Sequence, residues 1–308
     1  MIEGLTVGKG TGKQRGVGWA LGLAWVAMAW GSAGSALATP TVIEAVQAPV
    51  WVDRGEQRLV AVPGLALTNR DRLVTGDGAR AILRLADGTL VRLGPGSRAV
   101  LNALGEKQGG EMTAALDVQS GAFRLTGDGM GEVPPHHAIN VRAGQLTASS
   151  RGDDRLWGHA DATGEAVCLQ EGNLVVTQPE GGVVALNQPL QCYGVASGES
   201  AGKTYDVTRG DFALAALAVD IQEGPGSLRR GGRWAVRLAV LNSEAEALAL
   251  YDRALAAGFA PQMRPRRVAG GYRYELRVGQ VADQREAERL AARLAEVLNL
   301  AGPKAIKP

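Results

Sequence analysis

The sequence ends in two copies of one unit, "WAVRLAVLNSEAEALALYDRALAAG" at residues 234–258 and "YELRVGQVADQREAERLAARLAEV" at residues 274–297. Each copy opens with apolar residues at every second position, which is typical of a strand with one buried face. The apolar series of the first copy is Trp234, Val236, Leu238 and Val240. Each copy then continues into an amphipathic segment rich in Ala and Leu, which predicts a helix.

Both predicted helices carry start signals. Ser243 precedes Glu246 by three residues, which predicts a capping box at the start of the first helix. Asp283 stands in the same relation to Glu286 and is predicted to cap the second helix. Gly258 follows the first helical segment and supplies its stop signal.

Two further strands complete this C-terminal region, one over residues 259–268 and a short one over residues 302–308. The resulting order of elements is βαββαβ. This order predicts an α+β domain with a four-stranded antiparallel sheet and both helices on one face of it.

The other face of that sheet is predicted to be open and polar. The residues expected on it are Arg237, Arg273, Glu275 and Arg277. Trp234 and Tyr272 share the parity of the buried series and are expected in the core. An open polar face can be a binding platform. Any half-covered sheet must also be polar outside, so the pattern alone leaves ligand binding open.

Residues 233–308 resemble a SPOR domain, the module of bacterial division proteins that binds septal peptidoglycan stripped of its stem peptides. The resemblance rests on the doubled strand–helix unit and on "VRLAVLNSEAEA" and "YELRVGQVADQREAERL". It implies glycan binding by the open face, with Arg237, Arg273, Glu275 and Arg277 as contacts.

This chain departs from the SPOR pattern at several positions of the first strand. Arg237 stands where the family usually has Gln, and Val240 stands where it has Ser. Ala239, Leu241 and the pair at residues 280–281 also differ from the family's Gly, Phe and Pro-Phe. An Arg can still donate to sugar hydroxyls or pair with the lactyl carboxylate of muramic acid.

Residues 41–200 are dominated by short alternating runs separated by Gly and Asp-Gly turns. In "ARAILRLADGTLVRLGPGS" at residues 79–97, two apolar runs flank Asp87-Gly88, which predicts a hairpin with a type I′ turn. Repeated strands at this spacing predict an all-β sandwich or roll.

The same region resembles the FecR family of periplasmic domains over about residues 45–195. The stretches that carry the likeness are "LTNRDRLVTGDGARAILRLADGTLVRLGPGSRAVL", "LDVQSGAFRL" and "CLQEGNLVV". The resemblance implies an all-β periplasmic module that in some members links signals to a sigma factor. Only 15 residues precede the apolar run of this chain, so a direct sigma-factor role is not expected.

Residues 1–38 have the pattern of a secretory leader: a basic start, an apolar run from Gly16 and the small residues before a cut after Ala38. An uncleaved membrane anchor is the alternative. The predicted organisation is a signal peptide at 1–38, a FecR-like domain at 39–200, a linker at 201–232 with a short helix at 211–220, and a SPOR-like domain at 233–308.

Charge divides unevenly along the predicted mature chain. Residues 39–228 hold 15 Lys and Arg against 22 Asp and Glu, a net charge of −7, whereas residues 229–308 hold 15 against 8, a net of +7. A basic C-terminal domain fits an acidic or polymeric partner. Solvated helix faces would give the same balance.

The sequence offers little reactive chemistry. Cys168 and Cys192 are its two cysteines and can form one disulfide in an exported protein. The histidines, at 136, 137 and 159, lack a metal-ligand spacing. Neither a catalytic constellation nor a metal, cofactor or nucleic-acid site is predicted.

These patterns favour a non-enzymatic periplasmic protein of the cell envelope. In the leading hypothesis the C-terminal domain binds stem-peptide-stripped peptidoglycan and the β-domain is an interaction module. In the alternative the protein is an envelope signalling adaptor whose β-domain binds a protein partner, and the C-terminal domain is only a tether. A cell-wall hydrolase is disfavoured, because no carboxylate pair or nucleophile motif is present.

Overall fold

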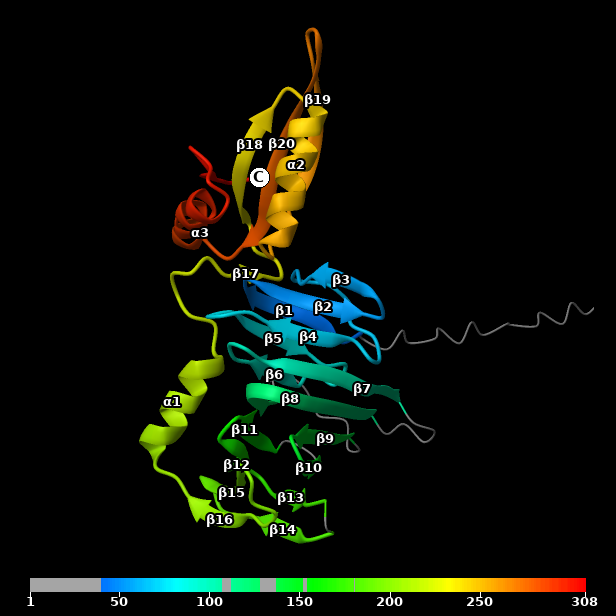
Figure 1. The fold of residues 1–308 in the computed structure, drawn as a ribbon, viewed down its shortest axis with the longest axis vertical. Helices are drawn as coiled ribbons and strands as arrows, with labels where there is room; N and C mark the ends of the chain where they lie inside the picture. Colours follow the sequence, from blue (N-terminus) through cyan, green and yellow to red (C-terminus); the bar gives the residue numbers. More distant parts are fainter. Residues whose placement is uncertain (1–39, 107–111, 128–136, 152–153, 180) are drawn as a thin grey trace, which may run out of the picture. The chain divides into compact units, whose positions relative to one another are not determined.

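The computed structural model describes residues 40–106, 112–127, 137–151, 154–179 and 181–308 (Figure 1). The predicted signal peptide and His136 lie outside the described residues. Among those that are described, no helix has the length and apolar character that a membrane span requires.

The N-terminal region is built from two sheets. In the first, neighbouring strands pair in antiparallel fashion. Their order is β16 (Lys203–Asp206), β15 (Gln191–Ala196), β12 (Gly164–Glu171), β11 (Arg155–Asp161), β8 (Met112–Thr126), β6 (Leu90–Leu93), β5 (Arg80–Arg84) and β1 (Val42–Gln47).

The second sheet has β8 in common with the first, because the first half of this long strand pairs with β7 and β9 and the second half with β6 and β11. The β8–β9 pair is parallel. The order is β3 (Gln57–Val60), β2 (Val50–Arg54), β4 (Arg72–Thr75), β7 (Arg98–Glu106), β8, β9 (His137–Ala143), β10 (Leu146–Arg151), β13 (Leu174–Thr177) and β14 (Val183–Leu186).

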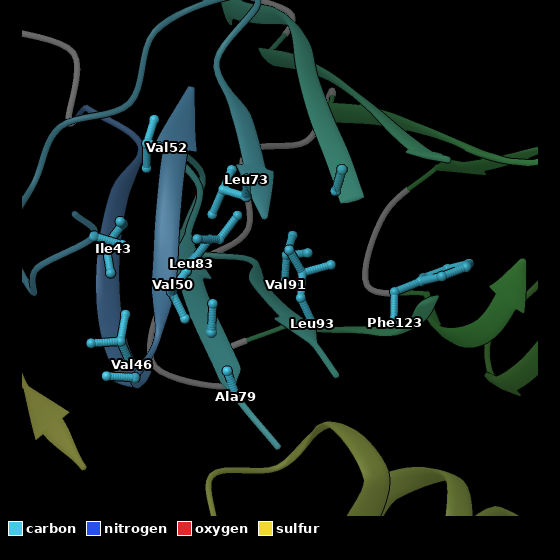
Figure 2. Close-up of a cluster of buried hydrophobic side chains, with 14 of the residues drawn as sticks. Ile43, Val46, Val50, Val52, Leu73, Ala79, Leu83, Val91, Leu93 and Phe123 are labelled. Atoms are coloured by element: carbon cyan, nitrogen blue, oxygen red, sulfur yellow. The ribbon is translucent and has the colours of Figure 1, made fainter. Parts of the chain in front are cut away.

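Alternate residues of both sheets form one apolar core (Figure 2). Ile43 and Leu83 come from the first sheet, Val52 and Leu73 from the second, and all four are fully buried. Each such side chain contributes roughly 1.5–3 kcal/mol by leaving water. The prediction of an all-β N-terminal region is confirmed.

Residues of the FecR-like stretch at 71–76 hold this core region together. Asp71 is buried and accepts two hydrogen bonds from Arg54, at 2.9 and 2.6 Å, and one from the Thr68 backbone at 2.9 Å. The Thr75 hydroxyl donates to the Gly94 carbonyl at 2.6 Å and accepts from the Ser97 backbone N–H at 2.8 Å. These motif side chains therefore serve the fold.

The β5–β6 hairpin differs from its predicted turn. Gly88 has a φ of 90°, but Asp87 is not among the residues with positive φ, and a type I′ turn needs both. The Gly88 N–H instead donates to the Leu85 carbonyl at 3.0 Å, and the Leu85 N–H donates to the Thr89 carbonyl at 2.8 Å. The longer loop places only the glycine in the left-handed region.

The segment expected to be a linker is largely ordered against the β-domain. Helix α1 (Arg209–Val219) begins at Thr208 with a capping box that includes Asp211. Its Phe212 ring lies 6.0 Å from the Trp157 ring, centroid to centroid. Trp157 packs in turn against the disulfide that joins Cys168 on β12 to Cys192 on β15.

The C-terminal region contains four antiparallel strands in the order β19 (Gln262–Val268), β20 (Gly271–Val281), β18 (Trp234–Leu241) and β21 (Lys304–Ile306). Helix α2 (Glu244–Ala256) packs on β18 and β20, and α3 (Gln284–Val297) packs on β18, β20 and β21 (Figure 1). The βαββαβ order is confirmed. Strand β17 (Leu228–Arg229) pairs with β1 and with the end of β20.

A β-bulge in β18 shifts the predicted alternation. Arg237 faces Arg277 on β20, but the next pairs are Ala239 with Leu276 and Val240 with Glu275, so Leu238 is the extra residue. Because a bulge moves every later side chain to the opposite face, Val240 is 48% exposed. Its prediction as a core residue is wrong.

The two aromatic residues expected in the core behave differently from each other. Trp234 is partly buried and packs against the core, as predicted. Tyr272 is 53% exposed, so its prediction as a core residue is wrong. It lies opposite Arg267 near the turn of the β19–β20 hairpin.

Candidate functional site

The sheet of the C-terminal region has one face that the helices cover and one that they leave open. Val236, Leu276 and Val278 join the buried side chains of α2 and α3 in the core. Strand neighbours alternate between faces, so Arg237 and Arg277 lie on the uncovered side. We call this side the open face.

A row of four polar residues crosses the open face, one from each strand. Gln262 pairs with Arg277, Arg277 with Arg237, and Arg237 with Lys304. Directly paired residues project from the same face of a sheet. With a strand spacing of about 4.8 Å, the row spans roughly 14 Å. We call these four residues the basic row.

Arg277 stands in the middle of the basic row and is unusually enclosed. It is 7% exposed, and its Nε is buried without a hydrogen-bond partner. Leaving a buried polar group unpaired costs about 1–3 kcal/mol, and more when the group is charged. Arg237 and Lys304, its neighbours in the basic row, are more accessible and present their charge to a ligand on the open face.

Beside the basic row, the open face holds one carboxylate, that of Glu275, which is 8% exposed. An Arg266 nitrogen lies 3.2 Å from the Glu275 carboxylate. Arg264 is the strand partner of Glu275, and Arg273 that of Arg266. Because the Glu275 carboxylate is already paired with Arg266, it can hold that arginine in position on the open face.

The electrostatic character of the open face is cationic. Three positive charges, on Arg237, Arg277 and Lys304, stand in adjacent positions of the basic row, and the pairings give them no carboxylate in between. Guanidinium groups bind carboxylates or phosphates through paired hydrogen bonds. The arrangement can therefore recognise an anionic group, while the Gln262 amide can donate to and accept from hydroxyls.

The four residues singled out from the sequence all belong to this face by register. Arg237 and Arg277 are central, Glu275 is tied to Arg266, and Arg273 is exposed toward the hairpin end. The sequence reasoning missed Gln262, Arg264, Arg266 and Lys304. The density of arginines in "RPRR" at 264–267 was an available signal, but the register of β19 and β21 was not.

Other reactive groups are not assembled into a site. The described residues include no group of three or more His, Cys, Asp or Glu side chains that could hold a metal. His159 has Asp161 at 4.0 Å on an accessible strand end. The structure of the His137 side chain is outside the described part.

Two family models match the chain, in the order that the sequence resemblances indicate. The FecR protein model matches residues 71–175, and the SPOR domain model matches residues 231–306. The chain thus carries a FecR region followed by a SPOR domain. Both are envelope-associated families of non-catalytic binding or signalling modules.

Comparison with solved structures finds two crystal structures of a candidate anti-sigma factor from Parabacteroides distasonis. Their sequence identities with this chain are 15% and 14%, and the TM-score is 0.38 for each. The matched regions cover 66% and 65% of this chain, and 95% and 96% of the two solved chains. A likeness at this level carries no argument about this protein. No curated protein matches the chain.

Proposed function

We propose that this chain is a non-enzymatic, exported protein of the cell envelope that binds peptidoglycan glycan strands through the open face of its SPOR domain. The FecR region serves as an interaction module beside it. The protein acts in the periplasm. The observation that carries the proposal is the basic row, with the unpartnered Nε of Arg277 at its centre.

The charge of the row favours stem-peptide-stripped glycan as the ligand. In intact peptidoglycan the lactyl carboxyl of muramic acid is joined to the peptide as a neutral amide. Removing the peptide by amide hydrolysis leaves a free carboxylate on the sugar. Pairing of Arg237 and Arg277 with such carboxylates would distinguish the freed acid on the sugar from the amide that it replaces.

Full-length protein, co-sedimented with purified peptidoglycan that is either intact or amidase-stripped, tests this proposal. The informative variants are Arg237→Ala/Lys304→Ala and Arg237→Ala/Arg277→Ala. The matched control is Arg209→Ala/Arg253→Ala, which removes two charges from exposed positions on the helices. We expect the first two to weaken binding to stripped glycan at least about ten-fold, because each removes charge-assisted hydrogen bonds.

Equal binding to both forms of peptidoglycan would contradict recognition of the freed carboxylate. Binding that the row variants and the helix control reduce alike would indicate non-specific charge. The Arg237→Ala/Lys304→Ala variant protects the test against misfolding, since neither residue is fully buried.

A second candidate function is that of an envelope signalling adaptor, in which the FecR region binds a protein and the SPOR domain only tethers it. Helix α1 supports this reading, because Leu214 and Leu217 are exposed on it while Phe212 anchors it to the β-domain. Retention of a crosslinked protein partner by a variant that has lost glycan binding would favour the adaptor.

A further inference from the structure

A groove of about 740 Å³ lies between residues 221–232 and the start of α3. Its volume falls within the range of small-molecule sites. Four arginines line it: Arg229, Arg230, Arg285 and Arg289. None of these residues belongs to the basic row of the open face.

The buried carboxylate of Glu286 builds one wall of the groove. It accepts hydrogen bonds from the backbone N–H groups of Gly224 at 2.5 Å, Gly226 at 2.9 Å and Ser227 at 2.9 Å. Leu228 then pairs with Val281 at the end of β20. The segment is fixed against α3 by these contacts, so the groove is already formed without a ligand.

The arginines of the groove are free to bind. Among the residues that the structure describes, none of the four has an ion-pair partner. The guanidinium of Arg289 lies over Gly224, where a Cβ would come within 2.5 Å of its Nη1. That glycine, at a φ of 106°, lets the arginine lie across the segment.

The acidic residues in the groove have contacts of their own, and the lining keeps an excess of one positive charge, from four arginines against Glu223, Asp283 and Glu286. The Glu286 carboxylate is satisfied by its three backbone donors. Asp283 accepts from the Glu286 N–H at 2.9 Å and caps α3, so the helix terminus is already occupied. Glu223 is the third carboxylate in the lining and is exposed. Four guanidinium groups around one concavity focus a positive potential within it.

We propose that this groove binds a diphosphate group, either of a soluble molecule or of a lipid headgroup. Each phosphate offers several acceptor oxygens and can be held by two guanidinium groups through paired hydrogen bonds. Two linked phosphates thus match four arginines in number. The site is independent of glycan recognition on the open face.

Calorimetric titration of the full-length protein with inorganic pyrophosphate tests the proposal, beside inorganic phosphate as a single-phosphate probe. Arg285→Gln/Arg289→Gln removes half of the arginines while keeping the helix. Arg209→Gln/Arg253→Gln is the control with the same loss of charge at exposed positions of α1 and α2, outside both the groove and the open face. We expect pyrophosphate to bind more tightly than phosphate, and the groove variant to weaken it at least about ten-fold with the control unchanged.

Flotation with phosphatidylcholine vesicles, with and without a polyprenyl diphosphate, separates the two sources of the ligand. Binding only to the diphosphate-bearing vesicles, lost in the groove variant, would assign a lipid headgroup. Pyrophosphate binding without vesicle binding would assign a soluble ligand. The proposal is overturned if wild-type protein binds neither probe, or if the groove variant and its control lose binding equally.

Discussion

Arg237 on β18 lies directly opposite Arg277 on β20. Like charges in facing positions of an antiparallel pair destabilise a sheet. This pairing is further enclosed, since Arg277 is largely buried. A local arrangement that opposes stability is what a binding site built for an anion would require.

The facing arginines predict that Arg237→Gln stabilises the protein. Relief of the repulsion should raise the free energy of unfolding by a few tenths of a kcal/mol, to about 0.5 kcal/mol at low ionic strength. Urea unfolding at low and high salt measures this, and the gain should shrink as salt screens the charges. A loss of stability at low salt would mean that the pair is not repulsive.

The β-bulge predicts opposite outcomes for two neighbouring apolar residues. Leu238→Ala should cost about 2–4 kcal/mol of unfolding free energy, because the side chain is buried. Val240→Ala should cost less than about 1 kcal/mol, because its side chain is largely in solvent. Denaturant unfolding of both variants measures these losses of free energy. Equally large losses would contradict the bulge and support a strand that alternates without interruption and buries Val240.

Glu286 is expected to contribute far more to the free energy of unfolding than a surface glutamate of the same helix. Glu286→Ala leaves three backbone N–H groups without their acceptor and should lower the unfolding free energy by about 2–4 kcal/mol. Glu288→Ala, at an exposed position of α3, is the control and should change it by less than about 0.5 kcal/mol. Thermal and urea unfolding of both variants measure the two losses. Similar losses for the two variants would contradict the prediction.

Asp71 predicts a pH dependence of stability. Its burial raises the pKa of the carboxyl, but hydrogen bonds from Arg54 and Thr68 together outweigh burial, so the pKa lies below the ordinary value of 3.8. A lowered folded-state pKa gives stabilisation that is complete above the unfolded-state pKa and is lost as pH falls through the folded-state value. The advantage of wild type over Asp71→Asn should therefore be about 3 kcal/mol near neutral pH.

That advantage should decline below about pH 4, where the unfolded chain begins to take up the proton. Unfolding free energies of both proteins at pH 7, 5 and 3 provide the comparison. A difference that stays constant down to pH 3 would show that Asp71 titrates normally in the folded protein.

Much of the C-terminal region could be predicted because its signals are local. The helix starts at Ser243 and Asp283 follow from cap chemistry, and the order of elements along the chain follows from the repeated unit. The bulge at Leu238 could not be predicted, since it depends on how β18 meets its partner strand. The role of the Glu286 carboxylate could not be predicted either, because it accepts hydrogen bonds from a segment about 60 residues away.

The candidate site shows the same division. The alternation of side chains along each strand predicted that Arg237 and Arg277 lie on the same face of the sheet. Their alignment with Gln262 and Lys304 depends on the register of β19 and β21, which no short-range pattern encodes. In the N-terminal region the Asp-Gly signal located a hairpin correctly but not its turn type, because the Leu85–Thr89 pairing lengthened the loop.

The double membership of β8 has a consequence for the rate of folding. This strand pairs with β6 and β7 before it in the chain and with β9 and β11 after it. Proteins dominated by such non-local pairings fold slowly, in milliseconds to seconds, since long loops must close before contacts form. During synthesis the two sheets are joined once β8 has emerged, but the pairing of β8 with β9 and β11 must wait until the chain as far as Ala160 has followed.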